Sequence, residues 1–112
     1  MYANLMALHR AGVPIVMGTD AGNPLTLHGP SVFPELEAMQ EAGLTPSEVL
    51  ASATSKAAAV LGRDDLGRIA PGYVADLVVV EEDPSANIAN LRSLTHVVRG
   101  GTVQTRAQVL WD

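Results

Sequence analysis

The sequence predicts an α/β chain in two parts, with helices and one buried strand in residues 1–65 and a β-rich module in residues 66–112. An apolar run without alternation at residues 13–17 is typical of a strand that is covered on both faces. Apolar residues then recur at helical spacing, and after Asp65 short β-prone runs alternate with glycine and proline turns. These three observations indicate the α/β class.

The first predicted element is a short helix that ends at Ala11. Apolar Leu5, Met6 and Leu8 stand among residues that are compatible with a helix. Gly12 follows at a position where helices commonly end in a left-handed conformation. The glycine therefore separates this helix from the strand that comes next.

The strand predicted at residues 13–17 stops abruptly before a loop. Residues 21–30 are rich in glycine, proline and asparagine, a composition typical of loops. This order places Asp20 at the carboxyl end of the strand. An aspartate there is commonly a cap for a helix or turn, and from Asp20 alone that interpretation is favoured.

Two further helices are predicted, at about residues 31–42 and 46–61. The first carries Val32, Leu36 and Met39 on one face, at spacings of four and three residues. The second contains many alanines, which permit close packing against a neighbouring element. It is expected to be a buried or half-buried helix.

The start of the second helix carries a strong local signal. Thr45-Pro46-Ser47-Glu48 is a capping box with proline at the first helical position. Leu44 and Val49 flank it at the spacing of a hydrophobic staple. The sequence therefore predicts a helix that begins directly after Thr45.

Beyond Asp65 the pattern changes to short strands joined by turns. The predicted strands are residues 68–70, 74–80, 95–99 and 102–104. Pro71-Gly72 and Gly100-Gly101 supply turns between them, and a turn-rich connection follows residue 80.

Composition excludes several classes of function. The 112 residues are 47% hydrophobic, which allows a core, and the net charge of −5 comes from scattered acids, so no nucleic-acid partner is expected. The absence of cysteine excludes disulfides and thiolate metal sites. No apolar run approaches the roughly 20 residues that span a bilayer, and the first residues lack a signal-peptide core. We expect a soluble, cytoplasmic protein without a membrane partner.

The order of the motifs is more specific than any one of them. In chain order they are Gly18-Thr19-Asp20-Ala21-Gly22, His28-Gly29, Ala42-Gly43-Leu44-Thr45-Pro46 and Leu66-Gly67-Arg68-Ile69-Ala70-Pro71-Gly72-Tyr73-Val74-Ala75-Asp76-Leu77-Val78-Val79-Val80. Over nearly the whole chain this order resembles the C-terminal end of the metal-dependent amidohydrolase superfamily. The most similar branches are the imidazolonepropionase-like and Xaa-Pro dipeptidase-like ones.

The resemblance implies a fold and a chemistry. Residues 13–17 would be the last strand of a (β/α)8 hydrolase barrel, incomplete in this chain, and residues 66–112 part of a small β-sandwich. Active sites of such barrels lie at the carboxyl ends of the strands. Asp20 would bind a divalent metal, with zinc favoured as one or two ions, and take a proton from the attacking water. The implied reaction is hydrolysis of a carbon–nitrogen bond in a small amide or cyclic amide substrate.

Three residues near Asp20 have two interpretations each. His28 lies where similar enzymes often contact substrate, and it is either a hydrogen-bond donor to substrate or a solvated loop residue. Thr19 and Asn23 either orient Asp20 through hydrogen bonds or satisfy backbone groups of the turn.

Most metal ligands of the similar enzymes have no counterpart here. Those enzymes use a His-x-His pair, a carboxylated lysine or glutamate, and further histidines from other strands; this chain has no such pair, and its single lysine, Lys56, falls on a predicted helix. His9 and His96 are expected to be structural or exposed, and Asp76 to hydrogen-bond within the β module.

The isolated chain is therefore expected to be an inactive fragment, whether a truncated reading frame, a proteolytic remnant or one part of an enzyme. One barrel strand with two helices leaves apolar faces and edges uncovered, so we expect the remainder of the barrel, or other copies of the chain, as partners. The alternative is a non-catalytic structural or interaction module derived from an amidohydrolase tail.

Overall fold

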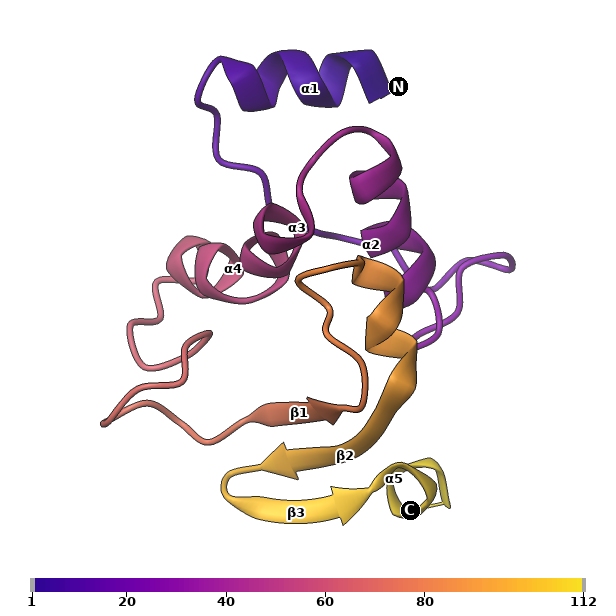
Figure 1. The fold of residues 1–112 in the computed structure, drawn as a ribbon, viewed down its shortest axis with the longest axis vertical. Helices are drawn as coiled ribbons and strands as arrows, with labels where there is room; N and C mark the ends of the chain where they lie inside the picture. Colours follow the sequence, from indigo (N-terminus) through magenta and orange to yellow (C-terminus); the bar gives the residue numbers. More distant parts are fainter. Residues whose placement is uncertain (1, 112) are drawn as a thin grey trace.

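The computed structural model describes residues 2–111, which form helices and one small sheet (Figure 1). In chain order the elements are α1 (Tyr2–Arg10), α2 (Val32–Glu41), α3 (Pro46–Ala53), α4 (Ser55–Val60), β1 (Leu77–Val80), the 3-10 helix η1 (Ile88–Ser93), β2 (Leu94–Arg99), β3 (Thr102–Thr105) and α5 (Arg106–Trp111). The α/β class is confirmed. None of the helices in this described part is long and apolar enough to cross a membrane.

The first two predicted helices are confirmed as α1 and α2. Leu36 and Met39 on the predicted face of α2 are buried, and Val32 packs against the same cluster. Helix α1 has no buried residue, and its Met6 lies over Gly43, where an added Cβ would meet the methionine sulfur at 3.4 Å. Helix α1 thus rests on the molecule at a few points instead of being enclosed by it.

The capping box at the start of α3 is confirmed. The Glu48 backbone N–H donates to Thr45 Oγ1 at 3.3 Å, and the Thr45 N–H donates to Glu48 Oε2 at 2.8 Å. Leu44 and Val49 are both buried in the same cluster, as a hydrophobic staple requires. Two N–H groups of the first turn are thereby satisfied, which fixes where α3 begins.

The prediction of one continuous helix over residues 46–61 is wrong. The helix is interrupted at Thr54, whose φ of −128° and ψ of −96° are not helical. The Thr54 hydroxyl donates to the carbonyl of Leu50 at 2.7 Å, four residues back. Threonine side chains compete in this way with the backbone for helix carbonyls. Two short helices, α3 and α4, result.

The strand predicted at residues 13–17 is also not formed in this structure. The segment is an irregular connection that is attached to α3 by one backbone hydrogen bond, from Met17 N to Ser52 O at 3.2 Å. Ile15 and Met17 pack against the core, whereas Val13 and Val16 are exposed. A strand needs a neighbouring strand to complete its ladder, and the described residues place none beside this segment.

The three strands form one antiparallel sheet in the order β1-β2-β3. The strands predicted at residues 95–99 and 102–104 are confirmed within one residue, and Leu77 pairs with Val98 in the adjoining ladder. Asp76 accepts a hydrogen bond from Gly100 N at 2.7 Å, which confirms its expected role in the β module.

The β module is smaller than predicted. The strand expected at residues 74–80 is limited to β1, and residues 68–70 form no strand. Instead, the chain closes on itself through hydrogen bonds from Val74 N to Asp65 O at 2.8 Å and from Tyr73 N to Ala70 O at 3.1 Å. Local turn bonds thus use backbone groups that a strand would offer to a neighbour.

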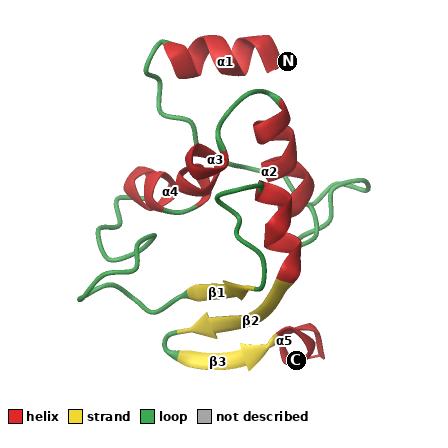
Figure 2. Cartoon of the chain, in the orientation of Figure 1, coloured by secondary structure: helices red, strands yellow, loops and turns green. Residues whose placement is uncertain are grey.

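The buried core lies between the helices and does not extend through the sheet. Its buried cluster consists of Leu36, Met39, Leu44, Val49 and Ile88. The strands gather at one end of the molecule, away from α1 (Figure 2). The radius of gyration is 14.6 Å, compared with about 13 Å expected for a compact domain of this length. The chain is therefore more open than a self-contained domain.

Candidate functional site

The chain between α1 and α2 contains a loop that projects to the side of α2 (Figure 1). Asp20 belongs to this connection, and its side chain is exposed. Its φ of 51° makes it the one non-glycine residue with positive φ within residues 2–111. Aspartate tolerates this left-handed conformation better than most residues because its short side chain can bond locally. Such backbone outliers cluster at functional sites, and they persist where surrounding interactions hold them.

Asn23 shapes the turn that follows Asp20. Its side-chain amide donates to the Asp20 backbone carbonyl at 3.2 Å, and its Oδ1 accepts from Leu25 N at 3.2 Å. Gly22 N donates to Thr26 O at 3.0 Å, which closes the turn. Asn23 thus contacts the main chain of Asp20 and not its carboxylate.

Thr19 is half-buried beside Asp20 and makes no hydrogen bond through its hydroxyl to any residue that the structure describes. The Asp20 carboxylate likewise has no protein partner within residues 2–111. The local fold therefore orients Asp20 through the backbone and leaves both carboxylate oxygens accessible. Such a carboxylate is chemically able to accept a proton or to ligate a cation.

His28 folds back over the beginning of the same loop. A Cβ added to Gly22 would lie 3.5 Å from the Nε2 atom of the His28 ring. The imidazole is exposed and lies beside the backbone two residues after Asp20. The structure thus brings the two predicted site residues onto one short loop, although they do not contact each other.

The described residues do not by themselves form a metal site. No group of three or more His, Cys, Asp or Glu side chains within residues 2–111 is arranged to hold an ion. His9 is paired with Glu48, with 3.1 Å between Nε2 and Oε1, and His96 contacts the Thr95 hydroxyl at 3.0 Å. Both histidines thus have a partner side chain in the described part of the chain.

Two carboxylates that take part in a helix cap and an ion pair have lowered pKa values. Hydrogen bonds from the Thr45 backbone and hydroxyl lower the pKa of Glu48, and His9 adds a smaller electrostatic effect. A hydrogen bond from Arg63 similarly lowers the pKa of Asp65. These shifts report caps and ion pairs that hold the fold, and not groups prepared for acid–base chemistry.

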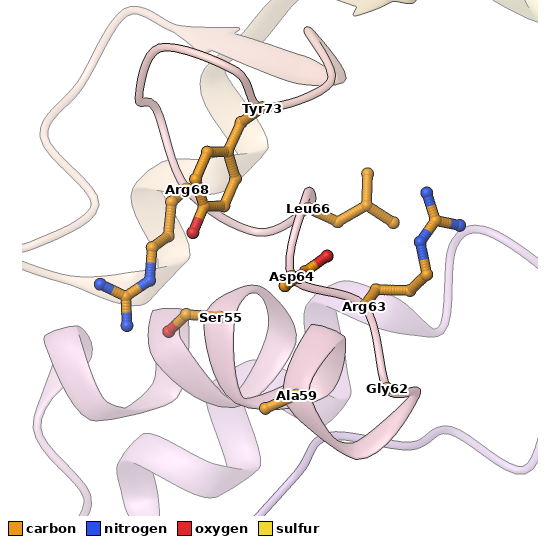
Figure 3. Close-up of a pocket in the computed structure, with 8 residues that line it drawn as sticks. All are labelled: Ser55, Ala59, Gly62, Arg63, Asp64, Leu66, Arg68 and Tyr73. Atoms are coloured by element: carbon orange, nitrogen blue, oxygen red, sulfur yellow. The ribbon is translucent and has the colours of Figure 1, made fainter.

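Two hollows on the surface are formed by residues outside the Asp20 loop. One, of about 390 Å³, lies between α4 and the loop that follows it, where Arg68 and Tyr73 extend over Ser55 (Figure 3). A second, of about 670 Å³, lies between Leu50 of α3 and the sheet. Neither is lined by a residue of the Asp20 loop.

Comparison with known proteins identifies the class. The model of the Amidohydrolase family matches residues 2–104, and the chain belongs to this family. Imidazolonepropionase of Salinispora tropica is 34% identical over 109 residues, which are 94% of this chain and 28% of that protein. Ochratoxinase of Aspergillus niger is 33% identical over 97 residues, 82% of this chain and 19% of that protein.

Solved structures give the same result for the fold. A Xaa-Pro dipeptidase with bound methionine in its active site has a TM-score of 0.84 at 31% identity, over 93% of this chain and 25% of that one. Molinate hydrolase has a TM-score of 0.83 at 32% identity, over 92% and 26%. The chain thus spans about a quarter of these structures, while nearly all of it is matched. The expected family resemblance is confirmed.

Two features near the site were not predicted from the sequence. One is the left-handed backbone of Asp20, for which Gly18 and Gly22 on either side were the available hint of an unusual turn. The other is the bond between Met17 and the backbone carbonyl of Ser52, which left no signal because any residue supplies a carbonyl.

Proposed function

We propose that this chain is the C-terminal part of a metal-dependent amidohydrolase that cleaves carbon–nitrogen bonds of amides or cyclic amides. The observation that carries the proposal is the placement of Asp20. In a chain that belongs to the Amidohydrolase family, this residue presents a free, exposed carboxylate on a loop that turn hydrogen bonds hold in shape. In the complete enzyme, residues 13–17 would be the last strand of a (β/α)8 barrel and residues 66–112 part of a β-sandwich.

Asp20 acts as the general base in this proposal. Its carboxylate accepts the proton of the water that attacks the carbonyl carbon, which makes the water a better nucleophile as the bond forms. Supporting this role, neither oxygen is engaged by a protein hydrogen bond within residues 2–111, so both can accept. His28, exposed on the same loop, donates a hydrogen bond to a carbonyl or carboxylate group of the substrate.

A divalent metal, with zinc favoured, would lower the pKa of a bound water and polarise the carbonyl group in the complete enzyme. The described residues supply one carboxylate to such a site, and catalytic zinc sites use about three protein ligands. The remaining ligands would come from the remainder of the barrel. The isolated chain is accordingly proposed to be inactive.

The test is Asp20→Asn in the full-length parent enzyme. Asparagine keeps the shape of the side chain and removes the charge that accepts the proton. We expect kcat to fall by about 10²- to 10⁴-fold, the usual contribution of a general base, with a smaller effect on KM. His28→Asn is the matched comparison, because it changes the same loop, and its loss of kcat is expected to be smaller.

Metal content and melting temperature of both variants complete the experiment. A folded Asp20→Asn enzyme with full metal content and near-normal turnover would overturn the proposed role. If turnover is lost together with the metal, the main role of Asp20 is to bind the metal. Its role as a base is then measured by the pH dependence of the residual rate.

A further inference from the structure

The last backbone carbonyls of α3 have no partner within the helix, and the groups that bond to them show how neighbouring segments are held in place. A helix leaves its last four carbonyls without intrahelical partners. Thr54 satisfies two of them: its hydroxyl donates to Leu50 O at 2.7 Å and its N–H to Ala51 O at 3.3 Å. The third, Ser52 O, accepts from Met17 N at 3.2 Å. Had the helix continued through Thr54, the Lys56 N–H would occupy the Ser52 carbonyl.

This third bond reaches the segment that carries Asp20. Met17 precedes Asp20 by three residues, and its N–H group is the donor that ties residues 13–17 to α3. Ser52 is fully buried, and its own hydroxyl donates to Val49 O at 2.6 Å. The acceptor therefore belongs to a part of α3 that is firmly fixed in the core, so it is a rigid anchor for the segment.

Gly67 lies directly against the interruption of the helix. A Cβ added to Gly67 would be 2.6 Å from Thr54 O, 2.7 Å from Thr54 C and 2.9 Å from Ser55 Cα. These contacts are backbone atoms that cannot rotate away, and the φ of Gly67 is +80°. The loop after α4 thus packs its main chain onto the break, and glycine is required because any side chain would push the two apart.

We propose that Thr54 and Gly67 are positioning residues for Asp20: they hold the interruption between α3 and α4 that frees the Ser52 carbonyl to anchor Met17. This inference rests on the catalytic role proposed for Asp20. The Asp20 loop extends beyond the core, and the loop contacts described above are internal to it, so the anchor at Met17 sets where the carboxylate stands. A shift of about 1 Å in a reacting group can cost about 100-fold in rate.

The main experiment compares Gly67→Ala with Gly72→Ala in the full-length parent enzyme. The two glycines occupy the same loop with similar φ angles, +80° and +87°, but an added Cβ at Gly72 meets nothing within 4 Å. Both variants therefore carry the backbone strain, and only Gly67→Ala disturbs the break. We expect kcat to fall by up to about 100-fold in Gly67→Ala, with KM changed much less, and little change in Gly72→Ala.

A second measurement tests the anchor itself. Amide hydrogen exchange of Met17, followed at residue resolution, is expected to be faster in Gly67→Ala than in Gly72→Ala, because the bond to Ser52 is weakened. A role that is merely structural predicts equal exchange at Met17 and a lowered melting temperature alone. Unchanged exchange and unchanged kcat in a folded Gly67→Ala enzyme would overturn the proposal.

If Gly67→Ala does not fold, two substitutions of Thr54 provide a less disruptive test. Thr54→Ala removes the hydroxyl bond to Leu50, and Thr54→Ser keeps a hydroxyl at the same position. Loss of kcat and of Met17 protection in the alanine variant, restored in the serine variant, supports the proposal; equal behaviour of the two overturns it. If Asp20→Asn retains full turnover, the proposed function fails, and the exchange of Met17 still reports separately whether the anchor exists.

Discussion

The core and the Asp20 loop are held by different physical means. The core residues Leu36, Val49 and Ile88 are almost completely buried. In the loop at residues 20–30, by contrast, Leu25 is 96% exposed, and the shape depends on hydrogen bonds within the turn. The shape of the loop that carries the proposed chemistry is thus set by hydrogen bonds within the loop, while the stability of the fold comes from the buried core. Loops placed on a rigid scaffold are the usual location of functional residues.

This difference predicts a large contrast between two apolar truncations. Ile88→Ala removes a side chain that is 2% exposed in the centre of the buried cluster. We expect a loss of about 2–5 kcal/mol in the free energy of unfolding, from lost burial plus the cavity that remains. Leu25→Ala in the Asp20 loop is expected to change stability by less than about 0.5 kcal/mol.

Urea unfolding of the two variants in the full-length parent, followed by circular dichroism, measures the contrast. Similar losses for Ile88→Ala and Leu25→Ala would show that the Asp20 loop is enclosed by other parts of the protein. In that case the division between a stable core and a locally specified loop would not hold for the intact molecule.

A smaller effect is expected at the exposed start of α3, next to the core. Thr45→Ala removes the acceptor for the Glu48 N–H and the hydroxyl that donates to Glu48 Oε2, while the backbone N–H of residue 45 can still donate to Glu48. The expected loss is about 1 kcal/mol in unfolding free energy, typical of an N-cap threonine. Thr45→Ser is the control, because serine is an equally good cap. A melting temperature that is the same for the alanine, serine and unchanged proteins would contradict the capping role.

What the sequence predicted follows the same division between local and distant causes. The capping box at Thr45 and the helix face of Leu36 were predictable because their partners lie within four residues. The interruption at Thr54 was not, because the bond from the threonine hydroxyl to Leu50 does not by itself end a helix, and the main chain that packs onto the break belongs to Gly67, thirteen residues further along. Helix propensity alone favoured continuation through the alanines, and tertiary packing prevailed.

The candidate site shows a similar limit. Sequence order correctly brought Asp20 and His28 onto one loop, because both belong to a short segment that is rich in turn residues. Residues 13–17 have the composition of a buried strand, but a strand needs partners, and the described residues provide none. The sequence pattern of a segment thus shows that it is able to form a strand. Whether the strand forms depends on neighbouring strands, which the pattern of the segment does not specify.

The smallest predicted effect concerns the ion pair that links α2 to η1 at the edge of the core. Arg92 Nη2 donates to Glu37 Oε2 at 3.0 Å, and the guanidinium also lies 5.1 Å from the centre of the Phe33 ring. The hydrogen bond from Arg92, helped by its charge and opposed by desolvation, lowers the pKa of Glu37. Both side chains are partly exposed, and pairs of this kind contribute little to stability.

Because the pKa of Glu37 is lower in the folded state, its contribution is present above the unfolded pKa, about 4.3, and is lost as pH falls through the folded pKa. At pH 7, Glu37→Gln is therefore expected to lower the melting temperature by less than Thr45→Ala does. The difference between Glu37→Gln and the unchanged protein should shrink as pH falls below the unfolded pKa, vanish below the folded pKa, and be smaller in high salt. Glu82→Gln, a change of the same charge at a side chain without a partner within residues 2–111, is the control. Melting curves of the two variants and the unchanged protein at several pH values test this expectation. A difference between Glu37→Gln and the unchanged protein that stays constant from pH 7 to pH 3 would contradict it. In that case the packing of the Glu37 side chain, and not its charge, would stabilise the contact between α2 and η1.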